Sequence, residues 1–240
     1  MNGPPADIRG MSRAAVAATI LIADDHPLFR DALRSAVARA VPSAVVHEAD
    51  SVASLLELVA ARPDADLLLL DLNMPGAQGL STLVHLRGSA PALPVMVVSA
   101  QHEPQVVRRS LAHGASGFVA KSADAGTIAE AIRMVLDGQR YVPFDAADPL
   151  ALEPDERDVA QRLAELTPHQ FRVLGMLSSG LLNKQIAYAL DVSEATVKAH
   201  MTAILRKLGA SNRTQAVLLA GKLALEPANV AELPPISGPA

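Results

Sequence analysis

Several polar side chains that could carry chemistry follow short apolar runs in the first half of the chain. They are Asp24 and Asp25 after the first run, Asp71 after the third, Ser99 at the end of the fourth and Lys121 after the fifth. A single aspartate after such a run is most often a turn or helix-cap residue. Their joint placement is much harder to obtain by chance, so we interpret these groups together as one site.

The residue types in this set are those of a phosphoryl-transfer site. Three gathered carboxylates repel one another, so they are stable together only around a hard cation, and carboxylate oxygens with water suit Mg²⁺. With the metal neutralising the group, one carboxylate could attack phosphorus, as in aspartyl-phosphate chemistry. Lys121 would then pair with the phosphoryl oxygens, and Ser99 would donate a hydrogen bond to one of them.

The elements that must position these groups alternate along residues 19–141. Each short apolar run, expected to be a strand, is followed by a longer amphipathic run, expected to be a helix. Residues 67–70 and 95–98 are apolar on both faces, which indicates a parallel sheet covered by helices on each side. The pattern predicts a doubly wound, flavodoxin-like α/β domain of five parallel strands, with its ligand crevice beyond the carboxyl ends of the strands. The five pairs are 19–23 with 28–41, 45–49 with 52–61, 67–70 with 80–86, 95–99 with 106–113, and 117–120 with 128–136.

Beyond residue 157 the sequence shows helix-start signals and no strand pattern. Thr167 and Gln170 form a capping box with Pro168 at the first helical position, and further starts lie at Ser193 and near residues 211–212. A small all-α bundle is therefore expected. We divide the chain into a mobile N-terminal tail (1–18), the α/β domain (19–141), an acidic linker (142–164), the helical domain (165–225) and a mobile C-terminal tail (226–240).

Charge is distributed unevenly among these segments. The 240 residues carry a formal net charge of −4, yet residues 165–225 alone carry +4, whereas the linker carries −4 and the α/β domain −3. A basic module behind an acidic one indicates that only the helical domain meets a polyanion. Aromatic residues make up 2% of the chain, which argues against stacking platforms for single-stranded nucleic acid.

The cellular compartment is constrained by two features of composition. The absence of cysteine excludes disulfides, thiolate zinc sites and a cysteine nucleophile, and is compatible with a reducing compartment. The longest mainly apolar stretch, residues 14–23, is too short to cross about 30 Å of hydrocarbon. Because Arg9 and Arg13 precede it, a secretory signal peptide is an alternative. The stretch runs directly into Asp24 and Asp25, as a buried strand at an acidic site would, so we expect a cytoplasmic protein with no membrane partner.

Four motifs at the predicted strand ends resemble the signature set of receiver domains of two-component response regulators. The motifs are ADDHP at residues 23–27, DLNMPG at 71–76, VSA at 98–100 and GFVAK at 117–121. The resemblance spans nearly all of residues 19–141. It implies a phosphoacceptor at Asp71, Mg²⁺ binding by Asp24, Asp25, Asp71 and the backbone carbonyl of Asn73, phosphate binding by Lys121, and switch roles for Ser99 and Phe118.

Two positions of the α/β domain leave alternatives open. Phe118 could equally be an ordinary core aromatic. Many receivers carry a cis-proline after the lysine, whereas this chain has Ser122. Because a non-proline cis bond costs about 3 kcal/mol, we expect a trans or less constrained loop there.

Residues 166–220 resemble, almost end to end, the LuxR-type helix-turn-helix of NarL/FixJ regulators. The matching motifs are LTP at 166–168, GLLNKQIA at 180–187, VSEATVKAH at 192–200, LRKLG at 205–209 and NRTQA at 212–216. The helix that begins at Ser193 would be the recognition helix, whose first turns enter the major groove of DNA. Lys198 is the best base-reading candidate, since a long cation can reach guanine O6 and N7. The other expected DNA contacts are Ala199 and Thr202 to bases, and Lys184, Thr196 and Arg206 to phosphates.

Three residues of this segment depart from the family pattern. Glutamate is usual where Gln170 and Gln185 stand, and an acid or similar residue is usual where Arg172 stands. Gln170 can still complete the capping box, but an ion pair within the module would be lost. For Lys184 and Lys207 the alternative to a phosphate contact is a solvated surface cation.

The sequence thus predicts a cytoplasmic response regulator that is phosphorylated on Asp71 by a sensor histidine kinase. Its helical domain would bind double-stranded promoter DNA as a homodimer formed on phosphorylation. The apolar stripe of Ala216, Val217, Leu219 and Ala220 is the candidate dimer contact, unless it only closes the bundle core. Self-catalysed phosphotransfer and dephosphorylation are expected of the receiver, but the output is regulation and not an enzymatic product.

Two other classes of protein would use some of the same residues. A metal-dependent phosphatase or phosphotransferase could use the acidic crevice. A second acid two residues after the nucleophile would favour that class, but this chain has Asn73 at that position. A DNA-binding protein that works without phosphorylation is a further alternative. The complete set of crevice residues argues against that alternative.

Overall fold

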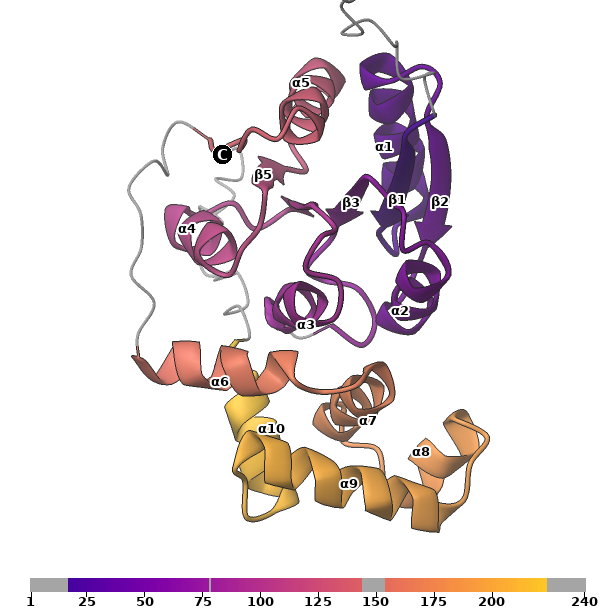
Figure 1. Ribbon diagram of the computed structural model, residues 1–240, viewed down its shortest axis with the longest axis vertical. Coiled ribbons are helices and arrows are strands. Elements are labelled where there is room, and N and C mark those ends of the chain that lie inside the picture. The colour runs from indigo at the N-terminus through magenta and orange to yellow at the C-terminus, as the bar shows by residue number, and fades with distance from the viewer. Residues whose placement is uncertain (1–16, 78, 144–153, 224–240) are drawn as a thin grey trace, which may run out of the picture.

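The computed structural model describes residues 17–77, 79–143 and 154–223 (Figure 1). The predicted tails, apart from residues 17 and 18, and linker residues 144–153 lie outside the described residues, so their mobility stays a prediction. Within the described ranges, no helix combines the length and apolar character needed to cross a membrane.

The first domain is built on one parallel sheet. Its strand order is β2-β1-β3-β4-β5, and every strand pair is parallel. The predicted flavodoxin-like, doubly wound fold is thereby confirmed. The strands are β1 (Thr19–Ala23), β2 (Val45–Ala49), β3 (Leu67–Leu70), β4 (Val95–Ser99) and β5 (Gly117–Ala120).

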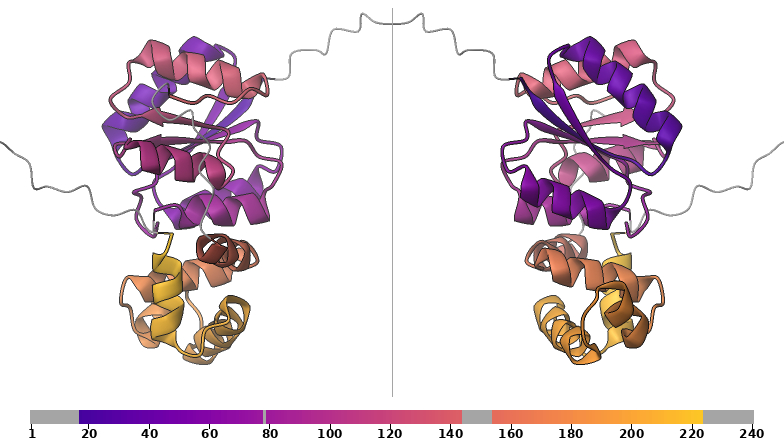
Figure 2. Two further views of the ribbon diagram at one scale, coloured as in Figure 1. Left: turned by 90° about the vertical axis from the view of Figure 1, so that its left-hand side faces the viewer. Right: turned by 90° about the vertical axis from the view of Figure 1, so that its right-hand side faces the viewer.

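Helices cover both faces of this sheet because successive side chains of a strand point to opposite sides. Ile20 and Ile22 of β1 pack on the side of α1 and α5, whereas Leu21 and Ala23 pack on the side of α2, α3 and α4. Figure 2 shows the sheet between these two helical layers. The helices are α1 (Pro27–Ala40), α2 (Val52–Ala61), α3 (Ser81–Ser89), α4 (Pro104–Ala112) and α5 (Ala125–Leu136).

The second domain is a bundle of short helices with clear local start and stop signals. Thr167 and Gln170 form the predicted capping box, and the Ser193 side chain accepts a hydrogen bond from the Thr196 amide at the start of α9. Gly209 ends α9 with φ 65°, a left-handed conformation that favours glycine. The helices are α6 (Pro154–Ala164), α7 (Pro168–Ser178), α8 (Asn183–Ala189), α9 (Glu194–Leu208) and α10 (Arg213–Gly221).

Helix α6 lies within residues 142–164, the segment predicted to be an acidic linker. The helix is amphipathic: Val159 and Leu163 are buried, whereas Asp155 and Asp158 are exposed. Helix α6 packs against α3 of the first domain (Figure 1). The two domains are therefore joined by a helix that contributes to a shared core.

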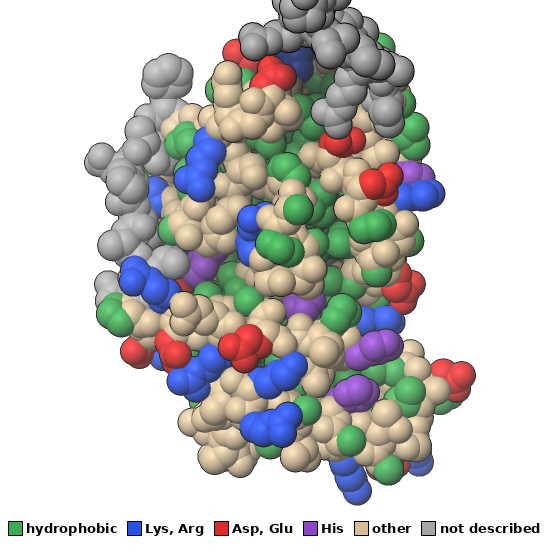
Figure 3. Space-filling model, in the orientation of Figure 1, with side chains coloured by type: hydrophobic (Ala, Val, Ile, Leu, Met, Phe, Trp, Pro, Cys, Tyr) green, Lys and Arg blue, Asp and Glu red, His purple; other side chains and the backbone are tan. Residues whose placement is uncertain are grey.

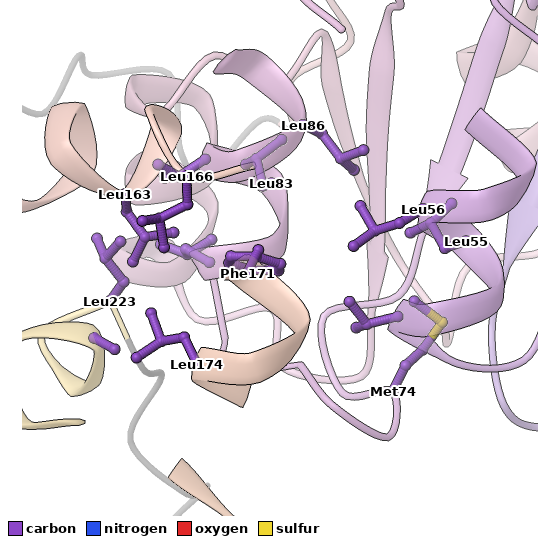
Figure 4. Packing of buried hydrophobic residues seen from close by; sticks show 14 of the residues in the cluster. Leu55, Leu56, Met74, Leu83, Leu86, Leu163, Leu166, Phe171, Leu174 and Leu223 are labelled. Atoms are coloured by element: carbon purple, nitrogen blue, oxygen red, sulfur yellow. The ribbon is translucent and has the colours of Figure 1, made fainter. Parts of the chain in front are cut away.

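One continuous apolar cluster crosses the boundary between the two domains. Leu83 and Leu86 of α3 belong to the same buried cluster as Leu163, Phe171 and Leu223 (Figure 4). Backbones approach closely here: a Cβ atom added to Gly88 of α3 would lie 2.4 Å from the carbonyl oxygen of Ala164 in α6. Glycine at position 88 is thus required for this docked arrangement.

A buried histidine lies at the centre of the interdomain contact. His85 of α3 stacks on Phe171 of α7, with ring centroids 4.2 Å apart and an interplanar angle of 4°. Neither ring nitrogen makes a hydrogen bond of ordinary geometry. Burial lowers the pKa of His85 to about 4, although the nearby backbone of Leu163 favours the protonated ring. His85 is therefore neutral at pH 7.

We expect acidification to weaken the folded, docked chain through His85. Its pKa is about 6.5 when exposed and about 4 when docked, so the unfolded chain binds more protons between these values. The His85 contribution is constant above pH 6.5, and up to about 3 kcal/mol is lost as the pH falls towards 4. Thermal melting of wild type and His85→Leu over pH 4–7 measures the difference. Parallel pH profiles for the two proteins would contradict the assignment.

Candidate functional site

The carboxyl edge of the sheet brings the predicted acidic groups together. Ala23 of β1 pairs with Leu70 of β3, so Asp24 and Asp71 leave the sheet side by side. Both side chains are buried, and Asp25 is partly exposed. The Nζ atom of Lys121 lies 2.6 Å from Asp24 Oδ2 and 2.8 Å from Asp71 Oδ2. The structure thus collects four of the predicted groups in one crevice.

Burial and the ammonium group shared by two carboxylates shift the pKa values of the crevice residues. Burial raises the pKa of Asp71, and the hydrogen bonds from Lys121 and the Asn73 amide only partly offset it. Burial opposes the charge on Lys121, but the carboxylates of Asp24 and Asp71 outweigh it and raise the pKa of that ammonium. Lys121 is therefore a fixed cation at neutral pH.

The crevice also has the donor set of a divalent-metal site. Asp24, Asp25, His26 and Asp71 each offer a ligand atom within 4.8 Å of the others. Three carboxylates against one ammonium leave excess negative charge, and hard carboxylate oxygens match the preference of Mg²⁺. Asn73 lines the same crevice, whose volume is about 400 Å³. The residues present fit Mg²⁺.

Ser99 and Phe118, the two predicted switch residues, lie at the end of β4 and within β5. The Ser99 hydroxyl is buried and accepts a hydrogen bond from the Gln101 amide at 3.1 Å, while its carbonyl accepts one from the Lys121 amide. Phe118 is fully buried in the core beneath α3 and α4. The Lys121–Ser122 peptide bond is trans, as expected without proline.

Three further residues of the crevice were not predicted from the sequence. The Phe29 ring lies under the Lys121 ammonium, 4.7 Å from ring centroid to Nζ, and Arg30 donates to the Asp24 carbonyl at 2.7 Å. His26 Nδ1 lies 2.8 Å from Asp25 Oδ1. All three follow Asp25 within five positions, so their proximity to the paired acids was the available signal.

The second candidate site is the exposed surface of α8 and α9. Within the described residues, the side chains of Lys184, Lys198 and Arg206 are exposed and take part in no hydrogen bond or ion pair. Figure 3 shows basic side chains over α9, below the acidic row that follows α6. The three cations are therefore free to meet phosphates or bases.

The remaining predicted DNA-contact residues have partly structural roles. Ala199 and Thr202 are exposed on α9, and the Thr202 hydroxyl donates to the Lys198 carbonyl at 3.0 Å. Thr196 is half-buried, and its hydroxyl lies 2.9 Å from the Ser193 hydroxyl at the helix start. Lys207 donates to the Glu165 carbonyl and to Gln170 Oε1, so it stabilises the bundle.

The residues that depart from the family pattern keep defined partners. Gln170 Oε1 accepts from the Thr167 amide and from Lys207, and Gln185 Oε1 accepts from the Leu182 amide at 2.7 Å. Arg172 pairs with Glu57 of α2 at 2.9 Å. The ion pair expected to be lost within the module is thus replaced by one between the two domains.

The predicted apolar stripe on α10 is divided between core and surface. Ala216 and Ala220 are buried and close the bundle core, and Val217 and Leu219 are half-buried. Leu218, which the prediction leaves out, is 68% exposed. The alternative that the stripe closes the core therefore holds for its two alanines, and Leu218 is the exposed apolar residue on this helix.

A parallel α/β domain with this acidic crevice, followed by a helix-turn-helix bundle with unpaired cations, defines a receiver domain coupled to a DNA-binding output. Residues 20–133 match the model of the response regulator receiver domain, and residues 164–220 match that of the bacterial regulatory proteins of the luxR family. Both matches cover the segments in which the motifs lie.

Whole-length relatives share this arrangement. The chain is 44% identical over 210 residues to a glycerol metabolism activator of Pseudomonas putida, covering 85% of this chain and 95% of the relative. It is 34% identical over 204 residues to the nitrate/nitrite response regulator protein NarL of Escherichia coli, covering 84% and 94%. The chain therefore belongs to the NarL-type response regulators, DNA-binding transcriptional regulators in which a receiver precedes a LuxR-type helix-turn-helix.

A solved structure shares the fold over most of the chain. RcsB from Salmonella enterica serovar Typhimurium, bound to promoter DNA in the presence of beryllofluoride, aligns with a TM-score of 0.52 and 22% identity. The alignment covers 87% of this chain and 100% of RcsB. At this identity it shows the fold alone.

Proposed function

We propose that Asp71 is the phosphoacceptor of this response regulator and that a sensor histidine kinase is its phosphoryl donor. The observation that carries the proposal is the buried Asp71 carboxylate held 2.8 Å from the Lys121 ammonium beside two further aspartates. A carboxylate oxygen of Asp71 attacks the phosphorus of a phosphohistidine. The P–N bond breaks as the P–O bond forms, and the departing imidazole takes up a proton.

The other crevice residues stabilise the charge that moves during this transfer. Asp24, Asp25, Asp71 and the Asn73 carbonyl would hold Mg²⁺, which supplies charge neutralisation of the phosphoryl oxygens when bound. Lys121 lies at hydrogen-bond distance from Asp71 and is positioned to pair with an incoming phosphoryl oxygen. Ser99 would turn its hydroxyl to the same group, and Phe118 would repack with it.

The proposed output is binding of double-stranded promoter DNA in the cytoplasm by a dimer that phosphorylation favours. The unpaired Lys198 on α9 and the flanking Lys184 and Arg206 support base and phosphate contacts, respectively. Leu218 of α10 supports a dimer contact, since it is an exposed apolar side chain beside the core of the bundle. The protein would show no turnover beyond its own phosphotransfer and dephosphorylation.

A direct test uses acetyl phosphate as a small donor. The full chain with acetyl phosphate and Mg²⁺ should run as a shifted species on a phosphate-affinity gel. Chelation of Mg²⁺ by EDTA should abolish the shift, because the three carboxylates then repel both one another and the donor. A shift of equal size without divalent metal would contradict the assigned metal site.

Replacing Lys198 by alanine should relax base preference at one position of the DNA site. A bidentate contact to guanine is worth about 1–3 kcal/mol of discrimination, so binding to the preferred base should weaken by that amount. The matched control is Lys184→Ala, which should weaken binding to all sequences and lower the salt slope by about 1. Selection of sites from random duplex DNA measures both. An equal loss on every sequence for Lys198→Ala would make it a phosphate contact.

A further inference from the structure

The two acids that follow β1 are joined by a peptide group that Arg30 of α1 holds in place. Arg30 Nη1 donates a hydrogen bond to the Asp24 carbonyl oxygen at 2.7 Å. That carbonyl belongs to the planar peptide group between Asp24 and Asp25, so its direction sets how the backbone enters Asp25. The Arg30 side chain is 19% exposed, and partial burial strengthens such a hydrogen bond. The two acids are therefore restrained through the backbone that they share.

Arg30 is held in turn by Glu48 of β2. Its Nε atom lies 3.1 Å from Glu48 Oε2, and Arg34, one turn further along α1, donates to Glu48 Oε1 at 2.8 Å. Strand β2 is the neighbour of β1, and the Asp24 amide donates to the Ala49 carbonyl at 3.1 Å. Arg30 and Glu48, which we call the Arg30 bracket, therefore tie the end of β1 to both α1 and β2.

Asp25 depends on its backbone for its position more than Asp24 does. Asp24 is buried, and its Oδ2 atom lies 2.6 Å from Lys121 Nζ. Within the described residues, the Asp25 carboxylate has a single side-chain partner at ion-pair distance, His26, whose ring is 65% exposed. Exposed pairs of this kind restrain a side chain weakly. The direction of the Asp25 carboxylate is therefore set mainly by the peptide group that Arg30 holds.

The Arg30 bracket works by geometry and not by its net charge. The Arg30 guanidinium faces the Glu48 carboxylate, so their formal charges offset each other beside the crevice. The charge that offsets the aspartates is that of Lys121, whose Nζ atom lies within 2.8 Å of Asp24 and Asp71. Arg30 instead supplies a hydrogen-bond donor at a fixed place. Groups that orient metal ligands in this way typically contribute about 10–100-fold to metal affinity.

We propose that Arg30 is a positioning residue for the metal-binding acids. By holding the peptide group between Asp24 and Asp25 against Glu48, it directs the Asp25 carboxylate towards the metal and sets the affinity of the crevice for Mg²⁺. This inference rests on the proposed function of the crevice. Arg30 is itself a cation and offers no ligand atom to a metal. Its loss therefore weakens metal binding and leaves the attacking carboxylate of Asp71 in place.

The test measures binding of Mn²⁺ alone to the full chain. Mn²⁺ prefers the same carboxylate oxygens as Mg²⁺, and electron paramagnetic resonance counts its free ion. Arg30→Met removes the guanidinium, keeps an unbranched side chain and leaves Glu48 paired with Arg34. We expect this variant to bind Mn²⁺ about tenfold more weakly than wild type.

The matched control is Arg34→Met. It makes the same chemical change on the same helix and at the same carboxylate, but Arg34 bonds Glu48 and Asp31 and not the Asp24 carbonyl. Because Arg34 is half exposed and does not hold the acidic pair, Mn²⁺ affinity should stay within about twofold of wild type.

Two further measurements separate positioning from a general loss of stability. Arg30→Lys should recover part of the affinity, since an ammonium can donate to the Asp24 carbonyl but lacks the fork that also engages Glu48. In labelling with acetyl phosphate, Arg30→Met should need about tenfold more Mg²⁺ for a half-maximal rate, yet reach the wild-type rate at saturation. A merely destabilised fold would lower the rate at saturating Mg²⁺ as well.

The remaining outcomes also decide the matter. Unchanged Mn²⁺ affinity in a folded Arg30→Met chain would overturn the positioning role. An equal loss in Arg34→Met would assign the effect to charge on α1, and would overturn it too. If Arg30→Met does not fold, Arg30→Lys replaces it, with an expected loss of about threefold, and unchanged binding by that variant would overturn the role. Failure of wild type to bind Mn²⁺ at all would contradict the proposed metal site itself.

Discussion

Replacing Asp71 by alanine or asparagine is expected to abolish phosphorylation completely. Asp71 supplies the attacking oxygen, and neither replacement offers a carboxylate at that place. Asp24 and Asp25 are the proposed Mg²⁺ ligands, so we do not expect either to take over the attack. Mobility on a phosphate-affinity gel after incubation with acetyl phosphate and Mg²⁺ measures the effect.

The matched control for this prediction is Asp64→Asn. Asp64 is exposed and precedes β3, at the opposite edge of the sheet from the crevice, so its loss should leave labelling unchanged. Label that persists in Asp71→Ala would move the phosphoacceptor elsewhere in the chain. Label lost in both variants would indicate damage to the fold.

Beryllofluoride with Mg²⁺ is expected to convert the protein towards a dimer and to raise its affinity for a two-site duplex by about 10²-fold. Two recognition helices on half-sites about one helical turn apart gain effective concentration without any new DNA contact. Shifting a two-state equilibrium from 1:99 to 99:1 takes about 5.5 kcal/mol, so we expect beryllofluoride to shift the population towards the dimer only in part. Analytical ultracentrifugation with and without beryllofluoride measures the association.

Two changes should remove the gain in affinity while keeping the single-site contacts. Leu218→Lys places a charge on the exposed apolar position of α10 and should weaken dimerisation. Insertion of about 5 base pairs between the half-sites turns one of them to the opposite face of the duplex. A monomer in both conditions whose DNA affinity still rises with beryllofluoride would make release of the docked domain, and not dimerisation, the switch.

The sequence predicted the sheet and its crevice because both depend on short, local patterns. Four apolar residues at Leu67–Leu70 specify a strand buried on both faces, and the parallel fold then brings the groups after each strand to one edge. The orientation of Lys121 over Phe29 depends on helix α1 packing on the sheet, which no local pattern specifies.

Helix α6 and the interdomain contact could not be predicted for a related reason. A helix rich in Asp and Arg resembles a solvated linker unless a partner for Val159 and Leu163 is known, and that partner lies in the other domain. Arg172 illustrates the same point. From the sequence alone, its departure from the family pattern predicts the loss of an ion pair within the helical domain, whereas the structure shows that Arg172 pairs with Glu57 of the other domain. In both cases the structure depends on contacts between the two domains, which local sequence patterns do not specify.

The central claim is that phosphorylation of Asp71 controls DNA binding, and one titration tests it most directly. Fluorescence anisotropy of a labelled two-site duplex is followed as wild type or Asp71→Ala is added, each with acetyl phosphate and Mg²⁺. We predict that acetyl phosphate tightens binding by wild type and leaves the weaker binding by Asp71→Ala unchanged. Equal tightening of both proteins, or of neither, would contradict the account.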